Sequence, residues 1–142
     1  MTDPFNLQRF VDAQAEVFAE VLAELRAGQK RSHWIWFIFP QMKSLGSSAQ
    51  ATFYGIGSFD EATAYMRHPV LGPRLVECTE LVNRVEDRTI REILGAPDDM
   101  KFRSSMTLFA RATEDDAVFR AAMEKYFDGK PDRLTLELLG DG

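Results

Sequence analysis

Apolar residues recur along most of this chain at the three- and four-residue spacing of an α-helix, with polar residues between them. The first such stripe predicts one helix over residues 10–25, built on Phe10, Val11, Gln14, Val17, Phe18, Val21, Leu22 and Leu25. Gly28 is expected to end this helix, since glycine favours the position just past a helix C-terminus. Gln14 is the polar member of the stripe, and a buried glutamine needs hydrogen-bond partners.

Further helices are predicted in seven segments that begin at a capping or turn residue: 46–54, 58–67, 72–85, 87–94, 96–109, 113–127 and 132–139. The apolar stripe predicted on the helix over 96–109 consists of Phe102, Met106 and Phe109. Ser58 with a glutamate three residues later has the pattern of a capping box. Asp87 and Asp132 are the expected N-caps of two later helices, and the run from Thr113 to Asp116 is expected to cap a third. His68, which precedes a proline, is expected to make a capping contact at a helix C-terminus.

The segment from Trp34 to Phe39 contains four aromatic residues in six positions and no polar side chain. Each of these side chains gains about 1.5–3 kcal/mol on full burial, so the segment must lie inside the protein. Its composition favours a strand, whereas the flanking helices and the lack of a convincing partner strand favour a helix. We predict a helix capped by Ser32 and ended by Pro40.

The predicted fold is therefore mainly α: a single compact multi-helix domain over residues 1–142, arranged around a buried aromatic segment. No repeat, linker or low-complexity stretch divides the chain. At 142 residues it is long enough to bury a sizeable core.

The charge balance disfavours one class of partner. A formal net charge of −5 makes a nucleic-acid binder unlikely on electrostatic grounds, because phosphate contacts require basic side chains. No apolar run approaches 18 residues and the N-terminus has no signal-peptide pattern, so we expect neither a membrane span nor export, and a cytoplasmic location. Cys78 is the sole cysteine and lies on an apolar stripe, which predicts a buried, inert thiol.

No strong catalytic or phosphate-binding motif is present, and two isolated histidines predict no metal site and no cofactor. The densest polar constellation, residues 98–105, joins two acids to basic and hydroxyl side chains, and its ordinary interpretation is a solvated helix N-terminus. His33 is of the residue type that most often performs acid–base chemistry near neutral pH, although a backbone hydrogen bond is the commoner role for a histidine at the edge of a core. The tryptophans could line a pocket or simply fill the core. The candidate ligand-binding residues are His33, Trp34, Gln41, Lys101, Arg103, Ser104 and Ser105.

Several runs resemble a known family. The run from His33 to Gln41, the run from His68 to Leu75 and the run from Pro97 to Phe109 are similar to the bacterial domain-of-unknown-function family 1810. The similarity spans almost the whole chain and implies a single, mainly α-helical domain, but no mechanism. Residues 42–44 depart from the smaller, glycine-containing sequences common there. Members are often named calpastatin, which implies a disordered inhibitor and conflicts with this aromatic-rich composition.

Three functional hypotheses follow. The first is a site for a small anionic or nucleotide-like ligand near the aromatic segment, with Lys101 or Arg103 holding the anionic group. The alternative is a protein–protein interaction module without catalytic activity and with an unknown partner protein. The weaker alternative is a hydrolase acting on nucleotide or ADP-ribose derivatives, for which no nucleophile–base pair is visible. Whether the protein is an enzyme stays open at this point.

Overall fold

The computed structural model describes residues 3–140, and this part of the chain is mainly α, as predicted. It contains a short 3₁₀ helix and ten α-helices, and β-structure within it is limited to a single isolated bridge. The elements are α1 (Gln8–Ala15), α2 (Phe18–Arg26), α3 (Ile35–Ile38), η1 (Lys43–Leu45), α4 (Ala49–Phe53), α5 (Phe59–Arg67), α6 (Leu71–Arg84), α7 (Ile90–Leu94), α8 (Asp98–Ala112), α9 (Ala117–Phe127) and α10 (Arg133–Leu138).

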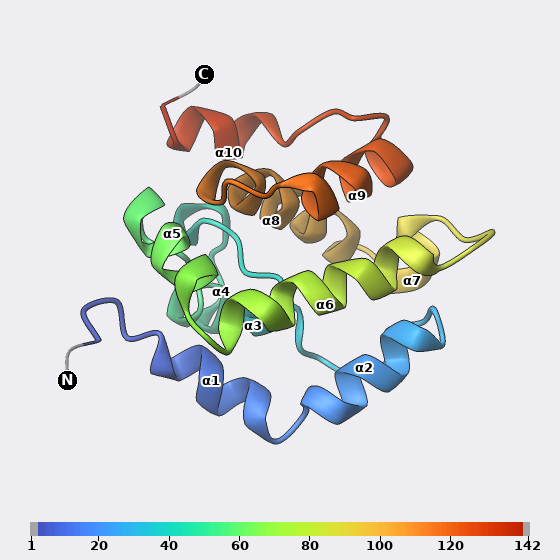
Figure 1. Cartoon of the computed structure of the whole chain (residues 1–142), viewed down its shortest axis with the longest axis horizontal. Coiled ribbons are helices and arrows are strands. Elements are labelled where there is room, and N and C mark those ends of the chain that lie inside the picture. The colour runs from blue at the N-terminus through green and yellow to red at the C-terminus, as the bar shows by residue number, and fades with distance from the viewer. Residues whose placement is uncertain (1–2, 141–142) are drawn as a thin grey trace.

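The helices pack into one compact unit with α8 at its centre. Figure 1 shows α1 and α2 along one side, α9 and α10 along the opposite side, and α6 crossing between them. Helix α8 contacts α3, α5, α7, α9 and α10. The stripe predicted on it, Phe102, Met106 and Phe109, is fully buried. A helix covered on several sides in this way forms the core of the domain.

The aromatic segment lies inside the protein, as predicted. Trp34, Ile35, Ile38 and Phe39 are at most 2% exposed, whereas Trp36 is half-buried. Only one helical turn forms, α3, which is shorter than the predicted helix. The burial prediction is confirmed, and the predicted length was too great.

The predicted cap of this segment was wrong. Trp34 occupies the N-cap position of α3. The Ser32 hydroxyl instead donates to Glu24 Oε2 at 2.6 Å, and the Trp34 indole Nε1 donates to Glu24 Oε1 at 3.0 Å. Glu24 is buried, so a carboxylate on α2 organises the entry to the aromatic segment.

An ion pair fixes the same entry to the start of α8. Lys30 Nζ lies 2.8 Å from Asp98 Oδ2 and 5.1 Å from the centroid of the Trp34 ring. Both partners are largely shielded from solvent. The aromatic segment is thus attached to α2 on one side and to α8 on the other.

The stripe over residues 10–25 forms two helices, α1 and α2, and the prediction of one helix was wrong. The Val17 amide donates to the Gln14 carbonyl, three residues back rather than four, and the helix is interrupted there. Gln14 is buried, and its Nε2 donates to the Phe37 carbonyl at 2.8 Å and to the Tyr65 hydroxyl at 3.3 Å. The predicted need of Gln14 for hydrogen-bond partners is confirmed.

One of the three predicted caps was wrong, by two residues. Thr89, not Asp87, caps α7, and it forms a capping box with Glu92. Asp87 has a positive φ of 61° in the preceding turn. Asp116, the last residue of the run predicted to cap α9 (Ala117–Phe127), occupies its N-cap position. Local composition alone does not choose among neighbouring polar residues that can each precede a helix.

Two further predicted capping contacts, at Glu61 and His68, form with other partners than expected. Ser58 Oγ accepts the backbone N–H of Glu61 as predicted, but the Glu61 carboxylate accepts from other groups and does not close a capping box. His68 Nδ1 accepts the backbone N–H groups of Val70 and Leu71, so it caps the start of the next helix rather than the end of its own.

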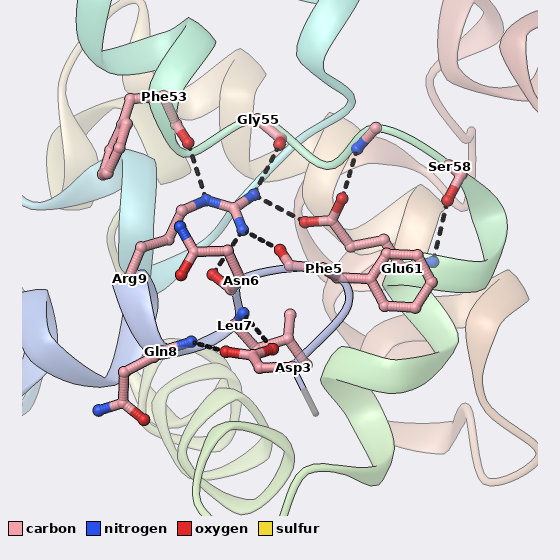
Figure 2. A network of polar contacts seen from close by, with 11 residues as sticks. Asp3, Phe5, Asn6, Leu7, Gln8, Arg9, Phe53, Gly55, Ser58 and Glu61 are labelled. Atoms are coloured by element: carbon pink, nitrogen blue, oxygen red, sulfur yellow. Dashed lines mark hydrogen bonds and ion pairs between the residues drawn. The ribbon is translucent and has the colours of Figure 1, made fainter. Parts of the chain in front are cut away.

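A charged network joins the N-terminal helix to the turn after α4, as Figure 2 shows. Arg9 Nε donates to the Phe53 carbonyl at 2.8 Å and Nη2 donates to the Gly55 carbonyl at 3.1 Å. The same Nη2 lies 2.7 Å from Glu61 Oε2, and both side chains are nearly buried. The planar guanidinium suits several acceptors in fixed directions, so it holds the turn at Gly55 in place.

Candidate ligand-binding site

A cleft of about 400 Å³ opens between the segment after α3, the first turns of α8 and the start of α10. Its walls are formed by Gln41, Leu45, Gly46, Ser47, Ser48, Ala51, Pro97, Met100, Lys101, Ser104, Asp132 and Leu134. Three segments distant in the sequence thus build it, and its lining mixes small, apolar and charged side chains.

The wall before α4 is positioned by backbone hydrogen bonds. Met42 and Ile56 form an isolated parallel bridge, in which the Lys43 amide donates to the Ile56 carbonyl and the Ile56 amide donates to the Gln41 carbonyl. Gly46 approaches the following helix so closely that a Cβ there would lie 2.4 Å from the Cβ of Ala51. A glycine is therefore required where this wall turns.

The opposite wall is fixed by hydrogen bonds between α8 and α10. Ser104 Oγ donates to Asp132 Oδ2 at 3.1 Å, and the Asp132 amide donates to Thr107 Oγ1 at 2.8 Å. Asp132 Oδ2 also accepts the Thr135 amide at 3.1 Å and caps α10 as predicted. Asp132 therefore has a structural role as well as a position in the cleft.

Lys101 is the cation that lines the cleft. Its Nζ lies 3.8 Å from Asp98 Oδ1, at the outer limit of an ion pair, while Asp98 Oδ2 is 2.8 Å from Lys30. Lys101 Nζ also lies 5.6 Å from the centroid of the Trp36 ring. A protonated amine has three donors, so this weak ion pair leaves Lys101 able to bind an anion.

A small recess of about 10 Å³ adjoins the cleft and shares Gln41, Ala51 and Lys101 with it. The other recess residues come from the aromatic segment and the turn after α4: Ile35, Trp36, Phe39, Tyr54 and Gly55. Trp36 Nε1 is buried and has no hydrogen-bond partner among the described residues. Buried N–H groups without a partner are uncommon in proteins, which draws attention to this position.

The structure brings three of the seven candidate residues together: Gln41, Lys101 and Ser104 line the same cleft. His33 is exposed and does not line it. Trp34 is 1% exposed and its indole is bonded to Glu24, so it belongs to the core.

The remaining two candidates also lie away from the cleft. Arg103 Nε donates to the Lys130 carbonyl at 2.9 Å, and its guanidinium lies 5.5 Å from the centroid of the Phe127 ring. Ser105 is fully buried, and its Oγ has no partner within the described part of the chain. Adjacent residues on a helix point about 100° apart, which separates Ser105 from Ser104.

Asp132 in the cleft and Trp36 in the recess are polar lining residues that the candidates did not include. Asp132 was predicted only as a helix cap, and no local signal indicates that its helix returns to α8. Trp36 differs from Trp34 in its greater exposure and in the lack of a polar partner, and both depend on tertiary structure.

A metal-binding cluster and a membrane-spanning helix are both absent from the described residues. Residues 3–140 contain no group of three or more His, Cys, Asp or Glu side chains placed to hold a metal ion. None of the helices in this range is long and apolar enough to span a membrane.

These observations define a class: a compact all-helical domain that surrounds an aromatic segment and has a mixed polar and apolar cleft beside it. The chain belongs to the family described as "Protein of unknown function (DUF1810)", whose sequence profile matches residues 4–139. The resemblance stated from the sequence is thus confirmed.

A solved structure supports the same fold. The conserved hypothetical protein Rv1873 from Mycobacterium tuberculosis is 59% identical in sequence and gives a TM-score of 0.96, with 97% of this chain and 99% of that chain covered. No curated protein matches the chain.

Proposed function

We propose that this protein binds a small anionic or nucleotide-like ligand in the cleft between Gln41 and α8. The observation that carries the proposal is the meeting of Gln41, Lys101 and Ser104 in one cleft beside an unpartnered indole N–H. Amide, ammonium and hydroxyl groups that converge on a hollow are typical of small-molecule sites.

The size and charge of the cleft narrow the class of ligand. A volume of about 400 Å³ lies in the usual range for small molecules. Lys101 attracts an anionic group, whereas the carboxylate of Asp132 disfavours a second negative charge beside it. The combination suits a ligand with one compact anionic group and a hydrogen-bond donor, such as the hydroxyl of a ribose.

An interaction module is a second candidate, because two apolar side chains at the cleft are exposed. Met100 is 48% and Leu134 is 58% exposed. A protein partner that covered these residues would use the same surface without any small ligand. The hydrolase hypothesis gains less support, since the Ser104 hydroxyl is engaged with Asp132 and the Met100 carbonyl.

A thermal-shift titration tests the proposal. The panel consists of inorganic phosphate, nucleoside monophosphates, sugar phosphates and small carboxylates. A ligand at 100 times its Kd stabilises a protein by about 2.7 kcal/mol, which corresponds to an increase in Tm of about 5–10 °C at this size. We expect at least one anion to raise the Tm of the wild type, and Lys101→Gln to weaken its binding by about tenfold or more.

Two matched variants serve as controls. Arg67→Gln removes one positive charge from an exposed position on α5, and His33→Ala removes an exposed side chain outside the cleft. Both should bind like the wild type. If no anion in the panel shifts the Tm, or if Lys101→Gln responds like the wild type, the proposal is wrong. The interaction module then becomes the better explanation of the exposed Met100 and Leu134.

A further inference from the structure

We infer that the cleft selects an aromatic anion held in one orientation, with its anionic oxygen at the recess beside Trp36 and its ring on Met100 and Leu134. This inference rests on the proposed function and specifies the ligand class of the same site. It follows from the size of the recess, from the donors beside it, and from the exposed side chains of Met100 and Leu134 in the cleft.

The recess is too small for a ring. At about 10 Å³, it has room for roughly a single water-sized group. A ligand in the cleft can therefore place one oxygen atom there, and its ring must stay in the larger cleft. The difference in volume between the recess and the cleft therefore determines which end of the ligand enters the recess.

Two donors beside the recess suit an anionic oxygen. Trp36 forms part of the recess wall, and its buried Nε1 has no acceptor among residues 3–140. Lys101 Nζ lies 5.6 Å from the Trp36 ring centroid, and its one ion pair with the described residues is the long contact of 3.8 Å to Asp98. An indole N–H and an ammonium group both donate, and neither accepts, so together they favour an oxygen that carries negative charge.

The outer end of the cleft offers apolar surface from two different helices. Met100 on α8 and Leu134 on α10 both line the cleft, although about half of each side chain is exposed to solvent. A flat ring placed against them would remove apolar area from water on both helices. Asp132 also lines the cleft and lies two residues before Leu134, so an anionic group placed against Leu134 would be repelled by this carboxylate, which opposes the reversed orientation.

The two tryptophans allow a direct test by ¹H–¹⁵N NMR of their indole N–H signals. Trp34 Nε1 is already bonded to Glu24 and serves as the internal reference, while Trp36 Nε1 reports on the recess. The signals are assigned with Trp36→Phe. The probes are 2-naphthoate, 2-naphthylmethanol as the ring without an anion, and inorganic phosphate as the anion without a ring.

We expect 2-naphthoate to move the Trp36 indole signal downfield and to leave the Trp34 signal in place. Phosphate and 2-naphthylmethanol should each bind at least tenfold more weakly than 2-naphthoate. Leu134→Ser should weaken 2-naphthoate about fivefold or more and leave phosphate binding unchanged. Leu138→Ser is the matched control, because Leu138 is a similarly exposed leucine on the same helix that does not line the cleft.

The other outcomes separate this inference from the proposed function. If anions bind in a Lys101-dependent way but 2-naphthoate has no advantage over phosphate, or the Trp36 signal does not move, the inference is wrong and the proposed function stands. If neither 2-naphthoate nor phosphate binds, the inference is wrong, and the thermal-shift panel decides the proposed function separately. If 2-naphthylmethanol binds as tightly as 2-naphthoate, the surface is simply apolar and the inference is again wrong.

Discussion

Replacement of Glu24 should destabilise this protein more than replacement of any exposed acid on the same helix. Glu24 Oε1 accepts the backbone N–H groups of Arg31 and Ser32 at 2.7 and 3.0 Å and the Trp34 indole N–H at 3.0 Å. Its Oε2 accepts the Ser32 hydroxyl at 2.6 Å. One buried carboxylate therefore satisfies four donors at the entry to the aromatic segment.

The cost of Glu24→Ala can be worked from these donors. A buried donor left without a partner costs about 1–3 kcal/mol, and the Ser32 amide and the Trp34 indole both lose theirs. We therefore expect a loss of about 3 kcal/mol in the free energy of unfolding, which corresponds to a decrease in Tm of about 6–12 °C. Glu24→Gln keeps one acceptor oxygen, so its loss should be about half as large.

The pH dependence gives an independent check. Burial alone would raise the pKa of Glu24, but the hydrogen bonds from Ser32, Arg31 and Trp34 outweigh it and lower the pKa from 4.5 to about 2. Since the folded pKa lies below the unfolded one, the stabilisation is fully present above about pH 4.5 and is lost as the pH falls toward 2. The stability difference between wild type and Glu24→Gln should shrink over this interval.

Urea denaturation followed by far-UV circular dichroism at pH 7, 4.5 and 3 measures both effects. Glu20→Gln is the control, because Glu20 is an exposed acid in the first turn of the same helix. Its effect should be within about 0.5 kcal/mol of zero, as for most surface substitutions. If Glu24→Gln has the same free energy of unfolding as the wild type at pH 7, the assigned role of Glu24 is wrong. It is also wrong if the difference between the two proteins does not change with pH.

Two further predictions concern the core. Gly72→Ala should lose about 1–3 kcal/mol in urea denaturation although alanine favours helices, because the added Cβ would lie 2.1 Å from the Met66 carbonyl oxygen. Gly57→Ala, whose Cβ meets nothing closer than 3.4 Å, should cost less, and equal losses would contradict the steric explanation. Burial raises the pKa of Cys78 to about 12, so a disulfide reagent should label it in urea but not in native protein. Rapid labelling under native conditions would contradict this prediction.

The sequence predicts the fold well where periodicity and burial agree. The apolar stripe of α8 and the aromatic segment are buried as predicted, since each must leave water whatever its neighbours do. The break at Val17 was not predictable, because the apolar spacing continues through it without interruption. The cap of α3 was also missed, since Ser32 pairs with a carboxylate on another helix.

The parts of the candidate site on α8 and at Gln41 were predictable from the sequence, whereas the part at the start of α10 was not. Lys101 and Ser104 share a face of one helix, and helical geometry alone relates them. Gln41 follows the aromatic segment directly, so its closeness to a core element was expected. Asp132 comes from a helix whose return to α8 depends on hydrogen bonds to Thr107 and Ser104. These contacts exist only once the chain has folded.

The hydrogen-bond partners of the polar residues near the aromatic segment distinguish those that are bonded within the protein from those that keep an unused donor. Trp34 and Trp36 are the same residue type two positions apart, and sequence alone cannot rank them. The Trp34 indole is satisfied by Glu24, ten residues upstream on another helix, whereas the Trp36 indole has no partner in the described chain. Arg103 likewise donates to the Lys130 carbonyl, whereas the ion pair of Lys101 with Asp98 is long, at 3.8 Å. A buried donor without a partner is destabilising until it gains an acceptor. We therefore expect an anionic ligand to bind at the Trp36 indole and at Lys101 rather than at Trp34 and Arg103.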